Sequence, residues 1–333
     1  MRRRRLNKPV ALLAGVVLAG SGLGAISLLA NAQLQEPAPA TGQAGPCLLI
    51  ANEKHVVIEN RVLGPCEGAG IEIRDSQDVT LRNVAITDAQ GAGIHILDST
   101  SIRVEESRIS TAASGIYALG SSGIVVSCNT FADPQGPKPR GQYVQFDKVI
   151  GGVNAITCNV GRSAAGRSTP EDGINLYESS GDQSNPILVT DNLLIGGGPS
   201  DSGGGILLGD NGGSFQQARN NVLVDPGQYG IAVAGGSYMT VADNTVFGRQ
   251  QPFTNVGVYV WNQYRPECFA ITVEGNSVQW ANRTGQQNAY WNAGNCGPVM
   301  ERKNDFSARL SETISQASIP AACKCRVNGR IRP

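Results

Sequence analysis

A short motif that returns at a near-constant interval constrains this 333-residue chain more than any other feature. Apolar-rich segments end in Asn again and again, and the distance between successive Asn residues never falls below 22. The positions are Asn60, Asn83, Asn129, Asn159, Asn192, Asn221, Asn244, Asn276 and Asn304, with Ser107 filling the one gap. A fixed unit that tolerates insertions is typical of a solenoid, in which each repeat stacks on the next.

A second set of short segments keeps step with the first, each a Gly followed by alternating apolar residues. They are Gly70–Ile73, Gly93–Ile96, Gly115–Ala118, Gly173–Leu176, Gly205–Leu208, Gly230–Val233 and Gly257–Val260. Alternation with period two indicates β-strands, and strands this short bury an apolar face only when coils stack. The 42 Gly residues and the lack of heptads argue against a helical bundle. The sequence therefore predicts an all-β fold, a single-stranded right-handed parallel β-helix of about ten coils over residues 47–304.

The first 32 residues have the pattern of a secretory signal peptide. Five basic residues precede an apolar stretch over 10–30, and the small residues Ala30 and Ala32 flank Asn31 as at a cleavage site. We expect cleavage after Ala32, a flexible leader over 33–46, and a secreted or periplasmic protein. Removing those five basic residues leaves 22 Lys and Arg against 27 Asp and Glu, a net charge of −5. We expect a monomer with no nucleic-acid partner and no membrane span.

Eight Cys residues in an exported chain favour disulfides over metal binding. Cys128 and Cys158 precede their ladder Asn residues identically, so we expect them to lie on adjacent coils and to pair. Two further pairings, Cys47 with Cys66 and Cys268 with Cys296, are hypotheses of the same kind. Beyond Asn304, Asp305 is placed to cap a helix in which Phe306, Leu310 and Ile314 form an apolar stripe, so residues 305–333 are predicted to form a helical, disulfide-bonded cap.

These repeats resemble those of the pectin-lyase-like superfamily of right-handed parallel β-helix proteins. The resemblance implies a polysaccharide partner, because members act mostly as polysaccharide lyases, glycoside hydrolases or uronate epimerases, while others are adhesins or phage tailspikes. Glu171-Asp172-Gly173 and the Gly203–Gly209 segment stand where a polygalacturonase-like chain has its paired Asp and its Gly-His-Gly, but the His is absent here. No specific enzyme family is matched, and no catalytic role transfers from this resemblance.

The middle coils carry both polar outward positions and the longest insertions. Relative to a 22-residue coil, the steps ending at Asn159, Asn192 and Asn221 have 8, 11 and 7 extra residues. Long loops beside a rigid sheet make a groove wall. The candidate catalytic residues of this groove are Asp172, Asp147, Asp210, Lys148 and Tyr177, and the candidate substrate-binding residues are Asn175, Glu178, Arg167, Tyr259 and Trp261.

Several mechanisms fit this set. A hydrolase would pair Asp172 with Asp147 or Asp210. A lyase or epimerase would neutralise a uronate carboxylate with Arg167 or Asn175 and use Lys148 or Tyr177 as base.

A non-catalytic glycan-binding or structural β-helix is the competing class, with the acidic residues acting in turns. In that class Asp172 caps the turn at Thr169-Pro170, Glu178 and Asp210 occupy ordinary turn positions, and Asp147 with Lys148 is a solvated pair. We assign no metal site, and leave Ca²⁺ open.

Overall fold

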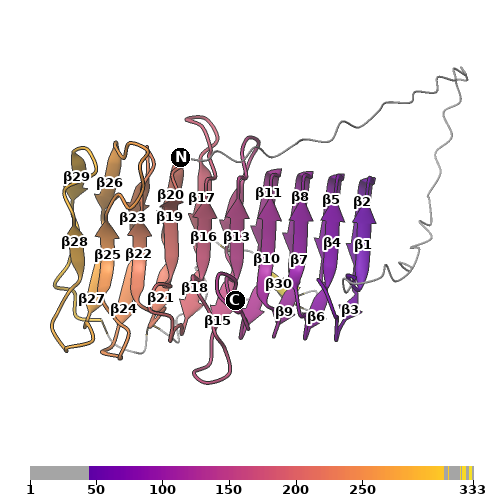
Figure 1. Ribbon diagram of the computed structural model, residues 1–333, viewed down its shortest axis with the longest axis horizontal. Coiled ribbons are helices and arrows are strands. Elements are labelled where there is room, and N and C mark those ends of the chain that lie inside the picture. The colour runs from indigo at the N-terminus through magenta and orange to yellow at the C-terminus, as the bar shows by residue number, and fades with distance from the viewer. Residues whose placement is uncertain (1–44, 311–313, 315–322, 324, 328–329, 332–333) are drawn as a thin grey trace, which may run out of the picture. The chain divides into compact units, whose positions relative to one another are not determined.

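The computed structural model describes residues 45–310, 314, 323, 325–327 and 330–331 (Figure 1). Its strands form three parallel sheets, to which each complete coil contributes one strand apiece. The first two sheets have ten strands and the third has nine, so the prediction of a right-handed parallel β-helix of about ten coils is confirmed. In Figure 1 the strands of consecutive coils lie side by side in chain order, from β1 to β29.

Sheet A contains the alternating apolar segments that the sequence predicted as β-strands. Its strands are β1 (Leu48–Ala51), β4 (Ile71–Arg74), β7 (Ala92–Leu97), β10 (Ser114–Leu119), β13 (Val144–Asp147), β16 (Ile174–Tyr177), β19 (Ile206–Asp210), β22 (Tyr229–Val233), β25 (Val256–Val260) and β28 (Tyr290–Asn292).

Sheet B follows sheet A in every coil. Its strands are β2 (Lys54–Glu59), β5 (Gln77–Arg82), β8 (Thr100–Glu105), β11 (Ser122–Ser127), β14 (Ala155–Thr157), β17 (Ile187–Thr190), β20 (Gln216–Arg219), β23 (Thr240–Ala242), β26 (Ile271–Glu274) and β29 (Val299–Arg302).

Sheet C completes each coil except the last. Its strands are β3 (Val62–Leu63), β6 (Ala85–Thr87), β9 (Arg108–Ser110), β12 (Thr130–Ala132), β15 (Val160–Arg162), β18 (Leu193–Ile195), β21 (Val222–Val224), β24 (Thr245–Gly248) and β27 (Ser277–Trp280). A separate antiparallel pair, β30 (Arg326–Val327) and β31 (Arg330–Ile331), lies near the C-terminus of the chain.

The core is built from the inward residues of the three sheets, stacked in columns along the coils. In sheet A, Ile94, Ile116 and Val144 pair in register and have no exposed surface. Each fully buried aliphatic side chain of this kind contributes about 1.5–3 kcal/mol relative to an exposed one. Because an inward position must be apolar, the alternating pattern fixes the strand register, and Val144 aligns with Ile116 although a long loop separates them in the chain.

The predicted Asn ladder exists along most of its length. Asn129, Asn159, Asn192, Asn221, Asn244, Asn276 and Asn304 form one continuous series in which each side-chain oxygen accepts hydrogen bonds from the previous Asn. Their amide groups also donate to backbone carbonyls of the preceding coil, such as Ile156 O for Asn192. These bonds satisfy buried backbone groups at the turn between sheets B and C.

The first two predicted members of this ladder are wrong. Asn60 and Asn83 stand one position earlier in their coils, where the backbone has φ of 56° and 50°. This left-handed conformation favours Asn, whose short polar side chain tolerates it. The ladder position itself is taken by Val84 and then by Ser107, whose Oγ accepts from the Val84 N–H.

Four disulfides join all eight Cys residues. The predicted pairs Cys47–Cys66 and Cys268–Cys296 are confirmed. Four disulfides are typical of a protein that folds in an oxidising extracellular or periplasmic compartment.

The predicted Cys128–Cys158 bridge is wrong. The two residues do lie on adjacent coils, but Cys128 pairs with Cys325 and Cys158 with Cys323. Cys323 and Cys325 thus bind two neighbouring coils, which are about 4.8 Å apart. The C-terminal segment is therefore fixed to the edge between sheets B and C.

The predicted C-terminal helix is also absent over the described residues 305–310. Asp305 instead makes a β-bridge with Ser277, and Phe306 stacks on Tyr290 at a centroid distance of 4.6 Å. The Asp305 bridge continues the coil instead of starting a helix. The Asp305 N–H donates to Asn276 O, and the Asp305 carbonyl accepts from the Val278 N–H of β27. Leu310, the next residue of the predicted stripe, lies outside any helix, and its N–H donates to Gln279 Oε1. Of the residues from 311 to 322, the structure describes only Ile314. No helix in the described part of the chain is long and apolar enough to cross a membrane.

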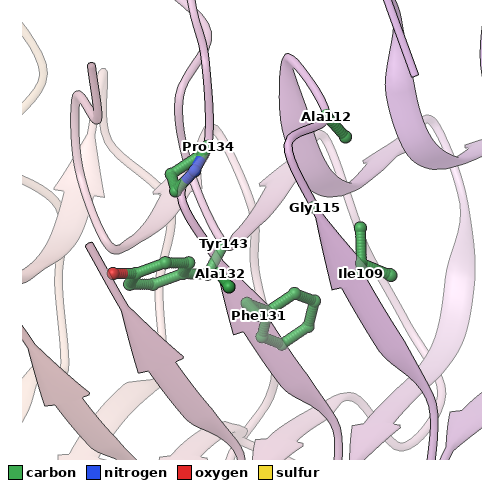
Figure 2. Close-up of a pocket in the computed structure, with 7 residues that line it drawn as sticks. All are labelled: Ile109, Ala112, Gly115, Phe131, Ala132, Pro134 and Tyr143. Carbon is green, nitrogen blue, oxygen red and sulfur yellow. The ribbon is translucent and has the colours of Figure 1, made fainter. Parts of the chain in front are cut away.

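A small gap lies inside the coil between β9, β10 and β12 (Figure 2). Ile109, Ala112, Phe131 and Tyr143 line it, and its volume of about 10 Å³ is close to the space of a single water. Its lining is largely apolar, so it is a packing gap rather than a ligand site.

Candidate functional site

An open groove of about 430 Å³ lies on the outer face of sheet A over the middle coils. The residues around it come from β13, β16, β19, β22 and β25 and from the loops between them. They are Lys138, Pro139, Arg140, Gln142, Gln145, Asp147, Glu171, Asp172, Asn175, Tyr177, Ser202, Leu207, Asp210, Tyr229, Tyr259, Gln263 and Tyr264. The groove therefore occupies the coils on which the sequence predicted a site.

The walls of the groove are formed by the three predicted insertions. One loop supplies Lys138 and Arg140, the next supplies Glu171, and the third supplies Ser202. The loops hold one another, because Ser202 Oγ donates to Glu171 Oε1 at 2.6 Å and Lys138 donates to Ser202 Oγ. Lys138 Nζ also lies 3.7 Å from Glu171 Oε1. These contacts fix the loop side chains over the sheet.

Asp172 is the most strongly buried acid of the groove, with 4% of its surface exposed. Its Oδ1 accepts hydrogen bonds from the Tyr229 hydroxyl at 2.5 Å and from the Gly204 N–H at 3.1 Å. Burial raises the pKa of Asp172 to about 7, although these hydrogen bonds work in the opposite direction. A side chain at position 204 would collide with the Tyr229 ring, so the glycine there permits this close approach. The carboxyl group can thus hold or release a proton near neutral pH.

Asn175 connects Asp172 to Asp210. Its Nδ2 donates at 2.8 Å to Asp172 Oδ2 and at 2.8 Å to Asp210 Oδ2. The two carboxylate oxygens therefore lie no more than twice that distance apart. The Oδ1 atom of Asn175 is buried and has no hydrogen-bond partner in the protein.

Asp210 reaches the groove through a bulge that the sequence did not reveal. Asn175 pairs with Leu207, so an unbroken register would place Gly209 beside Tyr177. The register shifts in β19, and Asp210 pairs with Tyr177 instead. Gly209 adopts φ of 67°, and a side chain there would strike the Gly235 backbone. The Tyr264 hydroxyl donates to Asp210 Oδ1 from a loop two coils away. Asp210 is therefore a residue of the groove floor, and its interpretation as an ordinary turn residue is wrong.

Asp147 lies on β13, one coil before the coil of Asp172, and it pairs in register with Tyr177 of β16. Its Oδ2 accepts from the Tyr117 hydroxyl at 2.7 Å. Arg140 stacks on the Tyr117 ring, 3.9 Å from the centroid, and donates to Gln145 Oε1 at 2.5 Å. Within the described part of the chain, Arg140 makes no ion pair with an acid. This end of the groove therefore offers an uncompensated guanidinium group.

Lys148 and Glu178 lie beside the groove rather than in its lining. Lys148 Nζ is 3.4 Å from both Asp147 Oδ1 and Glu178 Oε2, and 5.3 Å from the Tyr177 ring centroid. Asp147 raises the pKa of Lys148, and burial raises the pKa of Tyr177. Glu178 has φ of 45° and occupies a turn, as its alternative interpretation held. Neither Lys148 nor Tyr177 has the lowered pKa that a base needs near neutral pH.

The remaining predicted residues divide into two groups. Tyr259 lines the groove, packs edge-on against Tyr229 at 5.3 Å and is only 8% exposed. Arg167 points elsewhere, because its guanidinium lies 3.1 Å from Asp133 and its side chain is 73% exposed. Trp261 is 42% exposed and is not part of the groove lining.

Sequence reasoning missed Arg140, Tyr229, Tyr264 and Lys138. Tyr229 has the same position in its coil as Asp172 has two coils earlier, but only the side-chain contact shows that the Tyr229 hydroxyl donates to this acid. The others lie on loops, where no repeat fixes the direction of a side chain.

The comparisons with known proteins address the fold. Residues 46–278 match the family described as "Right handed beta helix region", which is more than half of the chain. The chain belongs to this right-handed β-helix family. A search of the curated proteins gives no match.

Three solved structures with a similar backbone illustrate this β-helix fold. An alginate lyase in complex with G6 has a TM-score of 0.46 and 12% identity, over 80% of this chain and 59% of that one. The catalytic domain of a GH87 alpha-1,3-glucanase in complex with tetrasaccharides has a TM-score of 0.45 and 14% identity, over 79% and 63%. An alginate lyase from Paenibacillus sp. str. FPU-7 has a TM-score of 0.44 and 15% identity, over 78% and 89%. This chain thus spans about six tenths of the first two.

No three His, Cys, Asp or Glu side chains of the described residues gather closely enough to hold a metal ion.

Proposed function

We propose that this β-helix is a glycoside hydrolase that cleaves a polysaccharide in the groove on sheet A, with Asp172 as general acid and Asp210 as nucleophile. The observation that carries the proposal is the bridge through Asn175 Nδ2, which holds two carboxyl groups side by side on adjacent coils of an open groove. Paired carboxyl groups about 5–5.5 Å apart are the arrangement of retaining glycosidases.

The two carboxyl groups have environments suited to different roles. Asp172 is buried and has a pKa of about 7, so it retains a proton near neutral pH and can donate it to the leaving glycosidic oxygen. Asp210 accepts hydrogen bonds from Asn175 and Tyr264, which orient its oxygens toward the groove. It attacks the anomeric carbon as the glycosidic bond breaks and forms a glycosyl ester. Water then attacks that ester, and Asp172 takes up the proton of the water.

Asp147 is less suited than Asp210 to pair with Asp172. Asp147 does not share the Asn175 Nδ2 donor that joins Asp172 to Asp210, and it accepts hydrogen bonds from Tyr117 and Lys148 instead. Its hydrogen bond from Tyr117 and its ion pair with Lys148 support a role in binding the substrate next to the cleavage site.

A uronate lyase or C5-epimerase is the second candidate, and Arg140 is the observation that favours it. The guanidinium lies in the groove, lacks an acidic partner among the described residues and is held by Tyr117 and Gln145, as a group that neutralises a substrate carboxylate would be. The base is the difficulty, because the pKa values of Lys148 and Tyr117 are raised. The pKa values of the groove tyrosines Tyr177, Tyr229, Tyr259 and Tyr264 are raised as well.

The test compares release of reducing ends by the mature protein and by Asp172→Asn and Asp210→Asn. Neutral and acidic polysaccharides are both offered. Each variant should lose at least about a hundredfold in kcat, while Asp201→Asn is the matched control. Asp201 is an acid at the groove rim whose side chain is 97% exposed. Full activity in both groove variants would refute the assignment.

We also propose that residues 1–32 are a signal peptide cleaved after Ala32, that 33–46 form a leader, and that the residues after 304 cap the β-helix domain. The four disulfides support export, because such bridges persist in oxidising compartments. N-terminal sequencing of the exported protein tests the cleavage site, and a mature chain starting at Gln33 is expected.

A further inference from the structure

Two tryptophans lie exposed on the last coils, beyond the C-terminal end of the groove. Trp261 is 42% exposed and Trp291 is 45% exposed, whereas Trp280, the third tryptophan of the chain, is fully buried. The rings of Trp261 and Trp291 meet edge to face, with centroids 5.9 Å apart and planes at 69°. Leaving two indoles in water forgoes the stabilisation that their burial would bring, so packing of the core does not explain them.

These tryptophans continue the line of the groove. Asn175, Leu207, Ala232, Tyr259 and Trp291 pair in register on successive strands of sheet A, from β16 to β28. Asn175, Leu207 and Tyr259 line the groove, and Trp291 is the next outward residue after Tyr259. Trp261 follows β25 directly and flanks Trp291. An aromatic surface therefore begins where the groove ends.

We propose that Trp261 and Trp291 form a sugar-binding subsite that extends the groove along the coils, so that the ligand is a long polysaccharide chain rather than a short oligosaccharide. The indole rings give an apolar, rigid surface with a polar N–H edge, which matches the apolar face and hydroxyl rim of a sugar ring. Four coil steps separate Asn175 from Trp291, about 19 Å along the coils. Only a chain of several sugar units touches both.

This inference rests on the proposed function, since it supposes that the groove holds part of the same chain. It adds that affinity and turnover depend on chain length, and that this dependence resides in two residues outside the groove.

The experiment measures binding of oligosaccharide ladders, from disaccharides to octasaccharides, prepared from neutral glucans and from alginate. Asp172→Asn serves as the background, because the proposed function predicts that it leaves the ligand intact. Calorimetry gives affinity, and quenching of tryptophan fluorescence reports on Trp261 and Trp291, since Trp280 is shielded. In this background, Trp291→Ala and Trp261→Ala are compared with the control Met300→Ala. Met300 lies on β29 of sheet B, in the same coil as Trp291, and is 53% exposed.

Affinity should rise with chain length, and Trp291→Ala should weaken binding of the longest oligosaccharides about tenfold without changing that of the shortest. Trp291→Phe should retain most of the effect, which separates loss of the ring from loss of folding. If affinity still rises with chain length in both alanine variants, the subsite is overturned and the groove assignment stands. Tryptophan-dependent binding of long chains with no cleavage by the wild-type protein would support the subsite and overturn the proposed function. Binding of no oligosaccharide would overturn both.

Discussion

The protonation of Asp172 makes the stability of this β-helix depend on pH in a direction that is unusual for a carboxyl group. Burial raises the pKa from an ordinary value of 3.8 to about 7, so the folded protein holds a proton that the unfolded chain releases. Below pH 4 both states are protonated and the group contributes nothing. Between pH 4 and pH 7 the folded state loses stability as the pH rises, and above pH 7 the loss is constant. The difference in pKa corresponds to about 4 kcal/mol.

Asp172→Asn removes the titrating group. The free energy of unfolding of the variant should therefore not fall between pH 4 and pH 7 for this reason. The variant exchanges a carboxylate oxygen for an amide donor opposite Asn175 Nδ2, which costs a fixed amount at every pH. The informative quantity is therefore the difference in free energy of unfolding between variant and wild type, measured by urea unfolding from pH 4 to pH 8. We expect the variant to gain about 4 kcal/mol relative to the wild type over that range. Parallel curves would refute a buried, proton-holding Asp172.

Three further predictions concern the coil, the C-terminal segment and the chemistry. Asn192→Ala removes four side-chain hydrogen bonds of a fully buried ladder residue. It should lower the free energy of unfolding, measured in urea, by about 4 kcal/mol. A loss below about 1 kcal/mol would contradict a stabilising role of the ladder. Replacing Cys323 and Cys325 by Ser should cost about 2–5 kcal/mol of stability but leave polysaccharide turnover intact, and a loss of turnover would place the C-terminal segment in the site. Hydrolysis should retain the anomeric configuration in nuclear magnetic resonance spectra of the first product, whereas inversion would exclude a nucleophile beside Asn175.

The regular part of the fold could be predicted from sequence because stacking leaves little freedom. Inward positions must be apolar and side chains alternate, so a single register satisfies each strand. The outward column through Gln145, Asn175 and Leu207 follows from this rule and is found in the structure. The insertions could also be located, because any residue beyond the 22 of a bare coil must leave the sheets.

The rest of the site could not be predicted, because it depends on contacts between side chains from different coils. The bulge at Gly209 moves Asp210 by one position, and a repeat pattern carries no signal for such an insertion. Arg140 and Tyr264 enter the groove from loops, where only packing fixes a side chain's direction. The pairing of Cys128 with Cys325 likewise depends on where the end of the chain docks, which is a contact across 197 residues of sequence.

The central claim is that the groove on sheet A hydrolyses glycosidic bonds. It is tested most directly by offering neutral and acidic polysaccharides to the purified mature protein and recording new reducing ends together with the ultraviolet absorbance of unsaturated sugars. Hydrolysis through Asp172 and Asp210 predicts new reducing ends without that absorbance. Reducing ends that appear with the absorbance would mean β-elimination and would contradict the hydrolase assignment in favour of a lyase that uses Arg140. No release from any polysaccharide in the panel would contradict both.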